Sequence, residues 1–197
     1  MKKLVIASNN PGKLREFQFL LQPLGIEVLT QAQLGIAEAA EPHYTFIENA
    51  LAKARHVSCL SGLPALADDS GICVEALGGA PGVLSARYAG DDPKSDRRNN
   101  EKLLQEMQGV ADRRAHYYCV LVLLHHAGDP QPLIAEGEWH GEIAHEERGD
   151  GGFGYDPLFW LPELGKMSAE LEREQKHSIS HRGKALQVLL QRLRRTT

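Results

Sequence analysis

The spacing of apolar residues along the chain predicts strands and helices that alternate. Segments with the continuous or alternating apolar pattern of strands occur at residues 4–7, 26–29, 63–67, 72–74, 117–124, 133–139 and 141–145. The run over 117–124 is the strongest of these signals, because it is almost continuously apolar and rich in β-branched and aromatic residues. Helical patterns fall between the strands, which predicts an α/β fold built on a mixed sheet.

Apolar residues at helical spacing predict helices after residue 12, after Thr45, over 98–107 and at the C-terminus. Thr45 and Glu48 have the spacing of a capping box, in which each satisfies a free backbone amide of the first turn. The residues predicted to face inward are Leu14, Phe17, Leu20, Leu21, Ala50, Leu51, Ala54, Val57, Leu103, Leu104, Met107, Ala185, Leu186, Leu189, Leu190 and Leu193. In the last helix, Arg192, Arg194 and Arg195 face outward and complement the helix dipole.

A polar turn between the first strand and the first helix is the first candidate for chemistry. It consists of Ser8, Asn9, Asn10, Pro11, Gly12 and Lys13. Such a turn presents backbone amides and the positive end of a helix dipole, which together favour an anion. The spacing of a Walker A loop is absent, so an ordinary turn with a helix cap is the alternative interpretation.

The second candidate is the acidic pair Asp68 and Asp69, with Glu41 and Glu48 upstream. Adjacent carboxylates between two extended segments can hold Mg²⁺ and activate a water molecule. A surface turn over Asp68–Gly71 is the alternative. Glu48 is already explained by the capping box, and a solvated charge is the default interpretation of Glu41, which precedes a proline.

A glycine-rich loop over Gly149–Pro157 is the third candidate. It contains G-x-G-x-x-G, but no apolar strand precedes it and no helix follows it, so a Rossmann site is rejected. Backbone can approach a ligand closely at such a loop, and Phe153 or Tyr155 can offer an aromatic face to a base. The alternative is a tight turn whose aromatic residues pack into the core.

A segment with basic residues at the start of the last helix forms the fourth candidate: Lys176, then residues 178–182, which are Ser178, Ile179, Ser180, His181 and Arg182. Helix N-termini favour acidic residues, so this mismatch indicates that the basic groups face something anionic or carbonyl-bearing. A solvated basic face is the alternative. His125 and His126 end a strand without a plausible third metal ligand and are interpreted as surface residues.

Composition narrows the class of protein. The chain has 197 residues, of which 42% are hydrophobic and 24% are charged, which suits one well-cored domain or two small lobes that share a core. The net charge of −4 offers no basic field for a nucleic-acid polymer. The apolar run after Lys3 is too short for a signal peptide or a membrane span.

Cysteine usage indicates a reducing compartment. Cys59, Cys73 and Cys119 are scattered, odd in number and in apolar surroundings. We therefore expect buried free thiols and a cytoplasmic protein.

The order of the motifs, more than any single one, is informative. The chain resembles the Ham1/inosine-triphosphatase family, the XTP/dITP pyrophosphatases, in a bacterial form and over nearly its full length. The matching stretches are SNNPGK (8–13), TFIENA (45–50), ADDSG (67–71), LGGAPG (77–82), SARY (85–88), GGFGYDP (151–157) and SHR (180–182). Ser8 stands where some members have threonine, which keeps the hydroxyl.

The resemblance implies one family domain over residues 1–197, with two α/β lobes around a long mixed sheet and the substrate in a central cleft. It also implies a homodimer. The implied reaction is hydrolysis of dITP, ITP and XTP between the α- and β-phosphates, which gives a monophosphate and pyrophosphate. We expect no membrane partner and no nucleic-acid partner.

The resemblance also assigns roles residue by residue. Ser8 to Lys13 would hold the phosphates. Glu41 and Asp69 would bind Mg²⁺, and Asp69 would be the general base. The implied substrate contacts are Ser70, Phe153, Gly154, Tyr155, Asp156, Lys176, His181 and Arg182. Elementary chemistry agrees, because Mg²⁺ and Lys13 can neutralise charge on the phosphates while Asp69 takes a proton from water.

Other functions remain open at this point. A pyrophosphatase for damaged pyrimidine nucleotides would use the same metal chemistry, and a panel of nucleotides separates the two. A nucleotide-binding sensor without turnover is disfavoured by the paired Asp68 and Asp69. An RNA-binding module is disfavoured by the charge and by the absence of a basic stripe.

Overall fold

The computed structural model describes residues 1–91 and 93–195, without the side chains of Glu16, Phe19, Leu20, Leu24 and Arg195. The chain divides into two compact units. Unit 1 comprises Met1–Asp69, Val120–Glu136 and the C-terminal helix from Ala185 on, and unit 2 comprises Ser70–Cys119 and Gly137–Lys184. The predicted positions of the Leu20 and Arg195 side chains lie outside the described part of the chain.

A seven-stranded mixed sheet has the strand order β2-β1-β3-β4-β5-β6-β7, as expected for the α/β class. The strands are β1 (Lys3–Ile6), β2 (Glu27–Thr30), β3 (Ala65–Val74), β4 (Arg114–Leu124), β5 (Leu133–Ile143), β6 (Phe159–Leu161) and β7 (Lys166–Met167). The helices are α1 (Pro11–Leu21), α2 (Phe46–Ser61), α3 (Asp96–Glu106), α4 (Arg173–Ile179) and α5 (His181–Arg195). Single 3-10 segments lie at Gln22–Leu24, Ala32–Leu34, Glu75–Leu77, Gly82–Arg87, Asp156–Leu158 and Ser168–Glu170.

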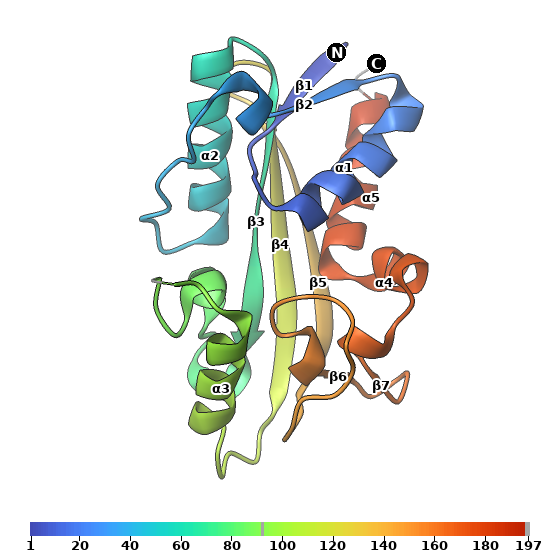
Figure 1. Cartoon of the computed structure of the whole chain (residues 1–197). Helices are drawn as coiled ribbons and strands as arrows, with labels where there is room; N and C mark the ends of the chain where they lie inside the picture. Colours follow the sequence, from blue (N-terminus) through green and yellow to red (C-terminus); the bar gives the residue numbers. More distant parts are fainter. Residues whose placement is uncertain (92, 196–197) are drawn as a thin grey trace. The chain divides into compact units, whose positions relative to one another are not determined.

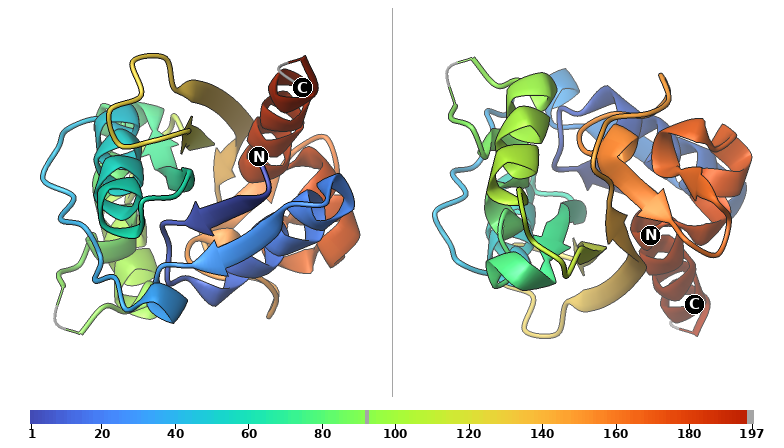
Figure 2. Two further views of the ribbon diagram at one scale, coloured as in Figure 1. Left: turned by 90° about the horizontal axis from the view of Figure 1, so that it is seen from above. Right: turned by 90° about the horizontal axis from the view of Figure 1, so that it is seen from below.

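In unit 1, β1 is parallel to β2 and to β3, with Leu4 opposite Val28 and Val5 opposite Ala65. Parallel strands need crossover connections, and α1 and α2 supply them. Helix α2 lies on one side of β1 and β3, whereas α1 and α5 lie on the other (Figures 1 and 2). Both sides of these strands are therefore covered, which explains their continuous apolar sequences.

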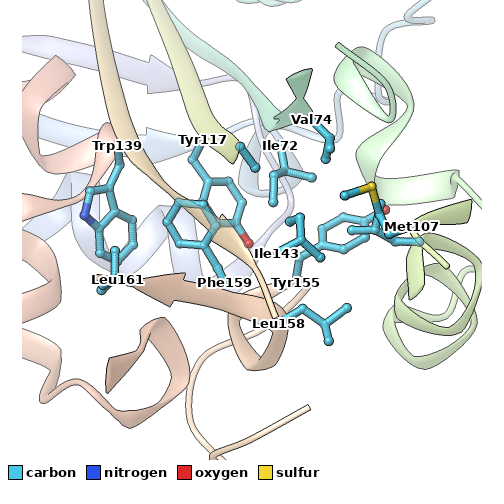
Figure 3. Close-up of a cluster of buried hydrophobic side chains, with 12 residues drawn as sticks. Ile72, Val74, Met107, Tyr117, Trp139, Ile143, Tyr155, Leu158, Phe159 and Leu161 are labelled. Carbon is cyan, nitrogen blue, oxygen red and sulfur yellow. The ribbon is translucent and has the colours of Figure 1, made fainter. Parts of the chain in front are cut away.

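In unit 2, one cluster of buried side chains joins α3, β4, β5, β6 and the C-terminal end of β3. It contains Ile72, Val74, Leu103, Met107, Ala115, Tyr117, Trp139, Ile143, Tyr155, Leu158, Phe159 and Leu161. Figure 3 shows that Trp139 lies at one end of this cluster and Met107 at the other, with Tyr117 and Phe159 between them. The strands contribute alternate residues to the cluster, so their other residues face away from it.

The side-chain cap predicted at Thr45 is present, although the Glu48 carboxylate accepts from the Thr45 hydroxyl and not from a backbone amide, as the predicted capping box requires. Thr45 accepts a hydrogen bond from the Glu48 amide and begins α2, and its hydroxyl donates to the Glu48 carboxylate at 2.6 Å. Asn10 caps α1 by accepting from the amides of Gly12 and Lys13. These local hydrogen bonds satisfy amides that the first helical turn leaves free.

Some predictions about the elements are wrong. The segments expected at 63–67 and 72–74 form one strand, β3, which passes through Asp68–Gly71 without a turn, and those expected at 133–139 and 141–145 form one strand, β5. Short elements such as α4 have too few residues for a detectable period. Cys59 is exposed and Cys73 partly exposed, so only Cys119 fits the expected buried thiol, although all three are free.

None of the described helices is long and apolar enough to cross a membrane. His125 and His126 are exposed, as predicted. The single-domain organisation and the cytoplasmic location stay predictions.

Candidate active site

Two consecutive carboxylates on β3 are buried: Asp68 is 1% exposed and Asp69 is 8% exposed. Because successive residues of a strand point to opposite faces, the two side chains diverge. Each meets a lysine from a different helix. Asp68 pairs with Lys13 of α1, and Asp69 pairs with Lys53 of α2.

Lys53 lies between two carboxylates. Its ammonium nitrogen is 2.9 Å from Oδ1 of Asp69 and 2.8 Å from Oε1 of Glu41. Burial alone would lower the pKa of Lys53, but the charges of Asp69, Asp68 and Glu41 outweigh it and raise that pKa above its usual range. Lys53 is therefore a permanent cation at neutral pH.

Burial and Lys53 shift the pKa of Asp69 in opposite directions. Burial raises the pKa of the Asp69 carboxyl above its ordinary value, and the charge and hydrogen bond of Lys53 pull it back down. Oδ2 of Asp69 is buried, and it has no hydrogen-bond partner among the residues that the structure describes. A carboxylate with one oxygen fixed and the other available is suited to accept a proton or to bind a cation.

These groups also fit the implied magnesium ion. Mg²⁺ is usually held by one or two carboxylates, with water and substrate oxygens in the remaining positions. Glu41 and Asp69 supply two carboxylates that share Lys53, and Asp69 keeps an available oxygen. Within residues 1–91 and 93–195, no group of three or more His, Cys, Asp or Glu side chains is placed to hold a metal ion. The two carboxylates Glu41 and Asp69 would therefore hold the ion together with water and the phosphate oxygens of the substrate.

The turn Ser8–Lys13 is organised by its own side chains. Asn10 Oδ1 accepts from Gly12 N at 2.9 Å and from Lys13 N at 3.2 Å, and Ser8 Oγ accepts from Asn10 N at 3.2 Å. Several amides that were expected to face an anion are thus engaged within the turn. The Lys13 ammonium lies 2.9 Å from Oδ2 of Asp68, which places a positive charge where the turn meets β3.

In unit 2, the residue that follows Asp69 contacts the start of α5. Nη2 of Arg182 donates to Oγ of Ser70 at 3.1 Å. Arg182 is only 4% exposed and His181 only 7% exposed, which argues against the solvated basic face considered above. A buried guanidinium needs acceptors, so this arginine is held for a purpose other than solubility.

His181 is held in an aromatic stack. Its ring lies 4.7 Å from the Tyr117 ring at an interplanar angle of 9°, and 6.4 Å from the Trp139 ring at 18°. Tyr117 is buried, and this burial raises the pKa of its hydroxyl well above the ordinary value. The stack fixes the plane of the imidazole and leaves its nitrogens at the edge of the ring.

The two aromatic residues of the glycine-rich loop have different environments. Tyr155 is 3% exposed, belongs to the buried cluster of unit 2 and donates to the Ser85 carbonyl at 2.8 Å. Phe153 is 46% exposed, and the Lys176 ammonium lies 5.5 Å from the centre of its ring. Phe153 therefore has the exposed aromatic face that could stack on a base, whereas Tyr155 anchors the loop.

Asp156 organises this loop from within. Oδ2 accepts from the Phe153 amide at 2.8 Å and from the Lys176 ammonium, and Oδ1 accepts from the Ser168 hydroxyl at 2.8 Å. At 3% exposure it is buried, and these three donors engage both of its oxygens. The predicted direct contact of Asp156 with substrate stays a prediction, and the hydrogen bonds favour a positioning role for it.

Glycine is required where α4 meets α5. A Cβ on Gly183 would lie 1.8 Å from the His177 carbonyl oxygen. We expect Gly183→Ala to force α4 and α5 apart and lower the free energy of unfolding by about 1–3 kcal/mol, measured by urea denaturation. Gly128→Ala is the control, because its Cβ would meet only a side-chain atom at 3.8 Å. Equal stability of the two variants would contradict the close approach.

Sequence reasoning missed Lys53, Tyr117 and Ser168. Lys53 lies four residues after Asn49 on a helix whose apolar pattern explains its neighbours, so it looks like an exposed helical lysine. Tyr117 lies in the strongest strand signal and is indistinguishable there from a core residue. The buried residues of α2 are small, and two of them, Asn49 and Ser58, are polar, so a polar neighbour at Lys53 gave no distinct signal.

Comparison with known proteins gives a consistent result. The model of the Ham1 family matches residues 4–192. A dITP/XTP pyrophosphatase from Nitrosomonas europaea is 67% identical over 98% of this chain and 95% of its own length, and one from Ralstonia nicotianae is 64% identical over 98% of both. The structure of a HAM1 protein from Coxiella burnetii superposes with a TM-score of 0.95 at 45% identity, and covers 99% of this chain and all of that one.

Proposed function

This chain belongs to the Ham1 family, and from that premise we propose that it hydrolyses the deaminated purine nucleotides dITP, ITP and XTP to monophosphate and pyrophosphate. The observation that carries the reaction is the set formed by buried Asp69 with partly buried Lys53 and Glu41 in unit 1. The choice of substrates rests on relatives of 56–67% identity that are named dITP/XTP pyrophosphatases. Binding of a nucleotide without turnover does not require a buried carboxylate beside a lysine, so the Asp69–Lys53 pair favours an enzyme over a sensor.

Asp69 is the proton acceptor in this proposal. Lys53 holds Oδ1 and opposes the effect of burial on the pKa, so that Oδ2 is available to take a proton from a water molecule. Lys13 places positive charge near the phosphates, and Asp68 fixes its position. Nucleotide pyrophosphatases generally use a divalent metal ion. We propose Mg²⁺, held by Glu41 and Asp69, which when bound neutralises phosphate charge and acidifies water.

Unit 2 supplies groups suited to a purine base. Phe153 offers an exposed ring, and Lys176 is held beside it by Asp156. His181 and Arg182 present ring and guanidinium N–H groups from a rigid helix start. We further propose that the enzyme is a cytoplasmic homodimer, as the family resemblance implies.

The test of the function is incubation of the full chain with a panel of nucleoside triphosphates and Mg²⁺, followed by identification of the products. We expect ITP, dITP and XTP to give the monophosphate and pyrophosphate. Early accumulation of the nucleoside diphosphate with orthophosphate would overturn the bond that we propose is cleaved. Preference for a damaged pyrimidine nucleotide would overturn the substrate class.

Stacking on Phe153 predicts a change in substrate affinity. Base–aromatic stacking contributes about 1–3 kcal/mol per base, so Phe153→Ala should raise KM for ITP roughly tenfold to a hundredfold, with a smaller change in kcat. Tyr155→Phe is the matched control, because it removes the hydrogen bond to Ser85 from a buried ring. We expect that control to lower thermal stability and to leave KM nearly unchanged. A raised KM in Tyr155→Phe with an unchanged KM in Phe153→Ala would show that the base contacts Tyr155 and not Phe153.

Selection of the base is proposed for Arg182. Hypoxanthine and xanthine carry a carbonyl at position 6, where adenine carries an amino group. A guanidinium only donates hydrogen bonds, so it satisfies the carbonyl and leaves the amino group facing another donor. An unpaired buried polar group costs about 1–3 kcal/mol, which is tenfold to a few hundredfold in kcat/KM.

Arg182→Ala should therefore reduce kcat/KM for ITP much more than for ATP. The measurement is the ratio of the two kcat/KM values. Lys184→Ala is the control, because it removes a neighbouring exposed cation of α5, whose ammonium donates to the Glu138 carbonyl at 2.8 Å. An equal loss for ITP and ATP in the Arg182 variant would show that it binds phosphate instead. Guanine also has a 6-carbonyl, so another group must exclude its 2-amino group.

A further inference from the structure

Two histidines lie side by side on the face of the unit 2 sheet that is turned away from the buried cluster. Figure 3 shows the buried face, which carries Tyr117 of β4 and Trp139 of β5. The neighbours of these residues, His116 and His140, therefore point to the other face. Their ring centroids are 5.5 Å apart and the planes differ by 38°.

Each of these histidines has its own carboxylate. Nδ1 of His116 is 3.4 Å from Oε1 of Glu75, and Nε2 of His140 is 3.1 Å from Oε2 of Glu138. A carboxylate that accepts from one ring nitrogen fixes the tautomer in which the other nitrogen carries the lone pair. The hydrogen bond to Glu138 leaves Nδ1 of His140 as an electron-pair donor, whereas Nδ1 of His116 is within ion-pair distance of Glu75 but makes no hydrogen bond to a described residue.

We propose that His116 and His140 together bind one divalent transition-metal ion of the Ni²⁺ or Zn²⁺ class. A ring nitrogen at about 2.0–2.1 Å on each side of such an ion brings the ring centroids roughly 5–6 Å apart, which the observed spacing matches. Imidazole suits these ions and not Mg²⁺, which prefers oxygen. Glu138 orients the His140 ring, as carboxylates do behind metal-bound histidines, and Glu75 places a negative charge beside His116.

Two protein nitrogens leave the other coordination positions to water. That agrees with the absence, among the described residues, of a group of three or more His, Cys, Asp or Glu placed around one metal position. Cys73 lies near both glutamates on the same face, but burial and these two charges raise the pKa of its thiol to about 11. Cys73 is thus protonated at neutral pH, and we do not count it as a ligand.

The site is accessible and independent of the proposed reaction. His140 is 70% exposed, and both glutamates are 50% exposed. All four residues belong to unit 2, whereas Asp69, Lys53 and Glu41 belong to unit 1. Because β4 and β5 are neighbours in the sheet, a bound ion would cross-link them.

The test is titration of the full chain with Ni²⁺ by isothermal calorimetry, in excess Mg²⁺ so that oxygen ligands are occupied. We expect one saturable site, weakened at least tenfold in His140→Ala and in His116→Ala. Glu138→Gln should weaken it to a lesser degree, by about tenfold at most. His126→Ala, which removes an exposed histidine outside the pair, should bind as the unmodified chain does.

Thermal unfolding gives a second readout. Ni²⁺ should raise the Tm of the unmodified chain and of His126→Ala, because an ion that binds only the folded state stabilises it. It should leave the Tm of His140→Ala unchanged. Absence of a saturable site in the unmodified chain, or unchanged affinity in His140→Ala, would overturn the proposal. Neither result would bear on hydrolysis of nucleotides, which is measured separately.

Discussion

Asp69→Asn is expected to lower kcat/KM for ITP by at least about 10²–10⁴, with the fold intact. Loss of a general base alone costs that much, and the loss of one carboxylate from the magnesium site adds to it. Asparagine keeps the size of the side chain and can still accept from Lys53 through its carbonyl oxygen. The measurement is steady-state release of pyrophosphate at saturating Mg²⁺.

The pH dependence of the reaction supplies an independent check. Since burial raises the pKa of Asp69, the acidic limb of the kcat/KM profile should lie above the ordinary aspartate pKa of about 3.9. That limb should be absent from the residual activity of Asp69→Asn. Asp112→Asn is the control, because Asp112 is an exposed carboxylate paired with Arg114. Near-normal turnover by Asp69→Asn would show that the base lies elsewhere.

The direction of the change in stability caused by Asp69→Asn follows from the pKa of Asp69. A carboxyl with a raised pKa in the folded state favours folding when protonated, and this contribution is lost as the pH rises from the unfolded pKa through the folded one. At neutral pH ionised Asp69 therefore costs stability, and asparagine removes that cost. Lys53 then loses one ionic partner but keeps Glu41. We expect a Tm within a few degrees of the unmodified chain.

Local sequence was sufficient for the elements that begin with their own caps. Asn10 and Thr45 each begin a helix because their side chains accept from amides within three residues, so no tertiary contact is needed to predict them. The same logic failed at β3. Asp68–Gly71 has the composition of a turn, yet it continues as a strand because Asp68 and Asp69 are each neutralised by a lysine from a distant segment.

The candidate site shows the same division. Asp69 was identifiable as one of two adjacent carboxylates between apolar segments, and Arg182 because a basic residue is unusual at a helix start. Lys53 and Tyr117 were not, because each fits the pattern of its own element and acquires its role only through a partner far away in the sequence. The sequence of the loop could not tell whether Phe153 or Tyr155 stacks on a base or packs into the core. Only their exposure in the structure separates the two residues.

Lys53→Met is the second substitution with a large expected effect, and its reason is electrostatic. Lys53 opposes the burial of Asp69 and also separates it from Glu41, whose charge raises the pKa of Asp69. Without the lysine, burial and Glu41 act on Asp69 with little opposition, so a larger fraction of the carboxyl is protonated at neutral pH. We expect kcat/KM for ITP to fall by about 10²–10³ there, the size of effect seen when one fixed electrostatic group is removed.

The distinguishing result for Lys53→Met is the shape of the pH profile. Because removal of a cation raises the pKa of a neighbouring carboxyl, the acidic limb should move to higher pH, and part of the lost activity should return as the pH rises. Asp69→Asn cannot show this recovery, since it has no carboxyl to ionise. Lys53→Arg keeps the charge and should keep the limb near its original position, whereas Lys184→Met should change nothing. If Lys53→Met lost activity equally at every pH, Lys53 would act on the substrate directly and not by keeping Asp69 ionised.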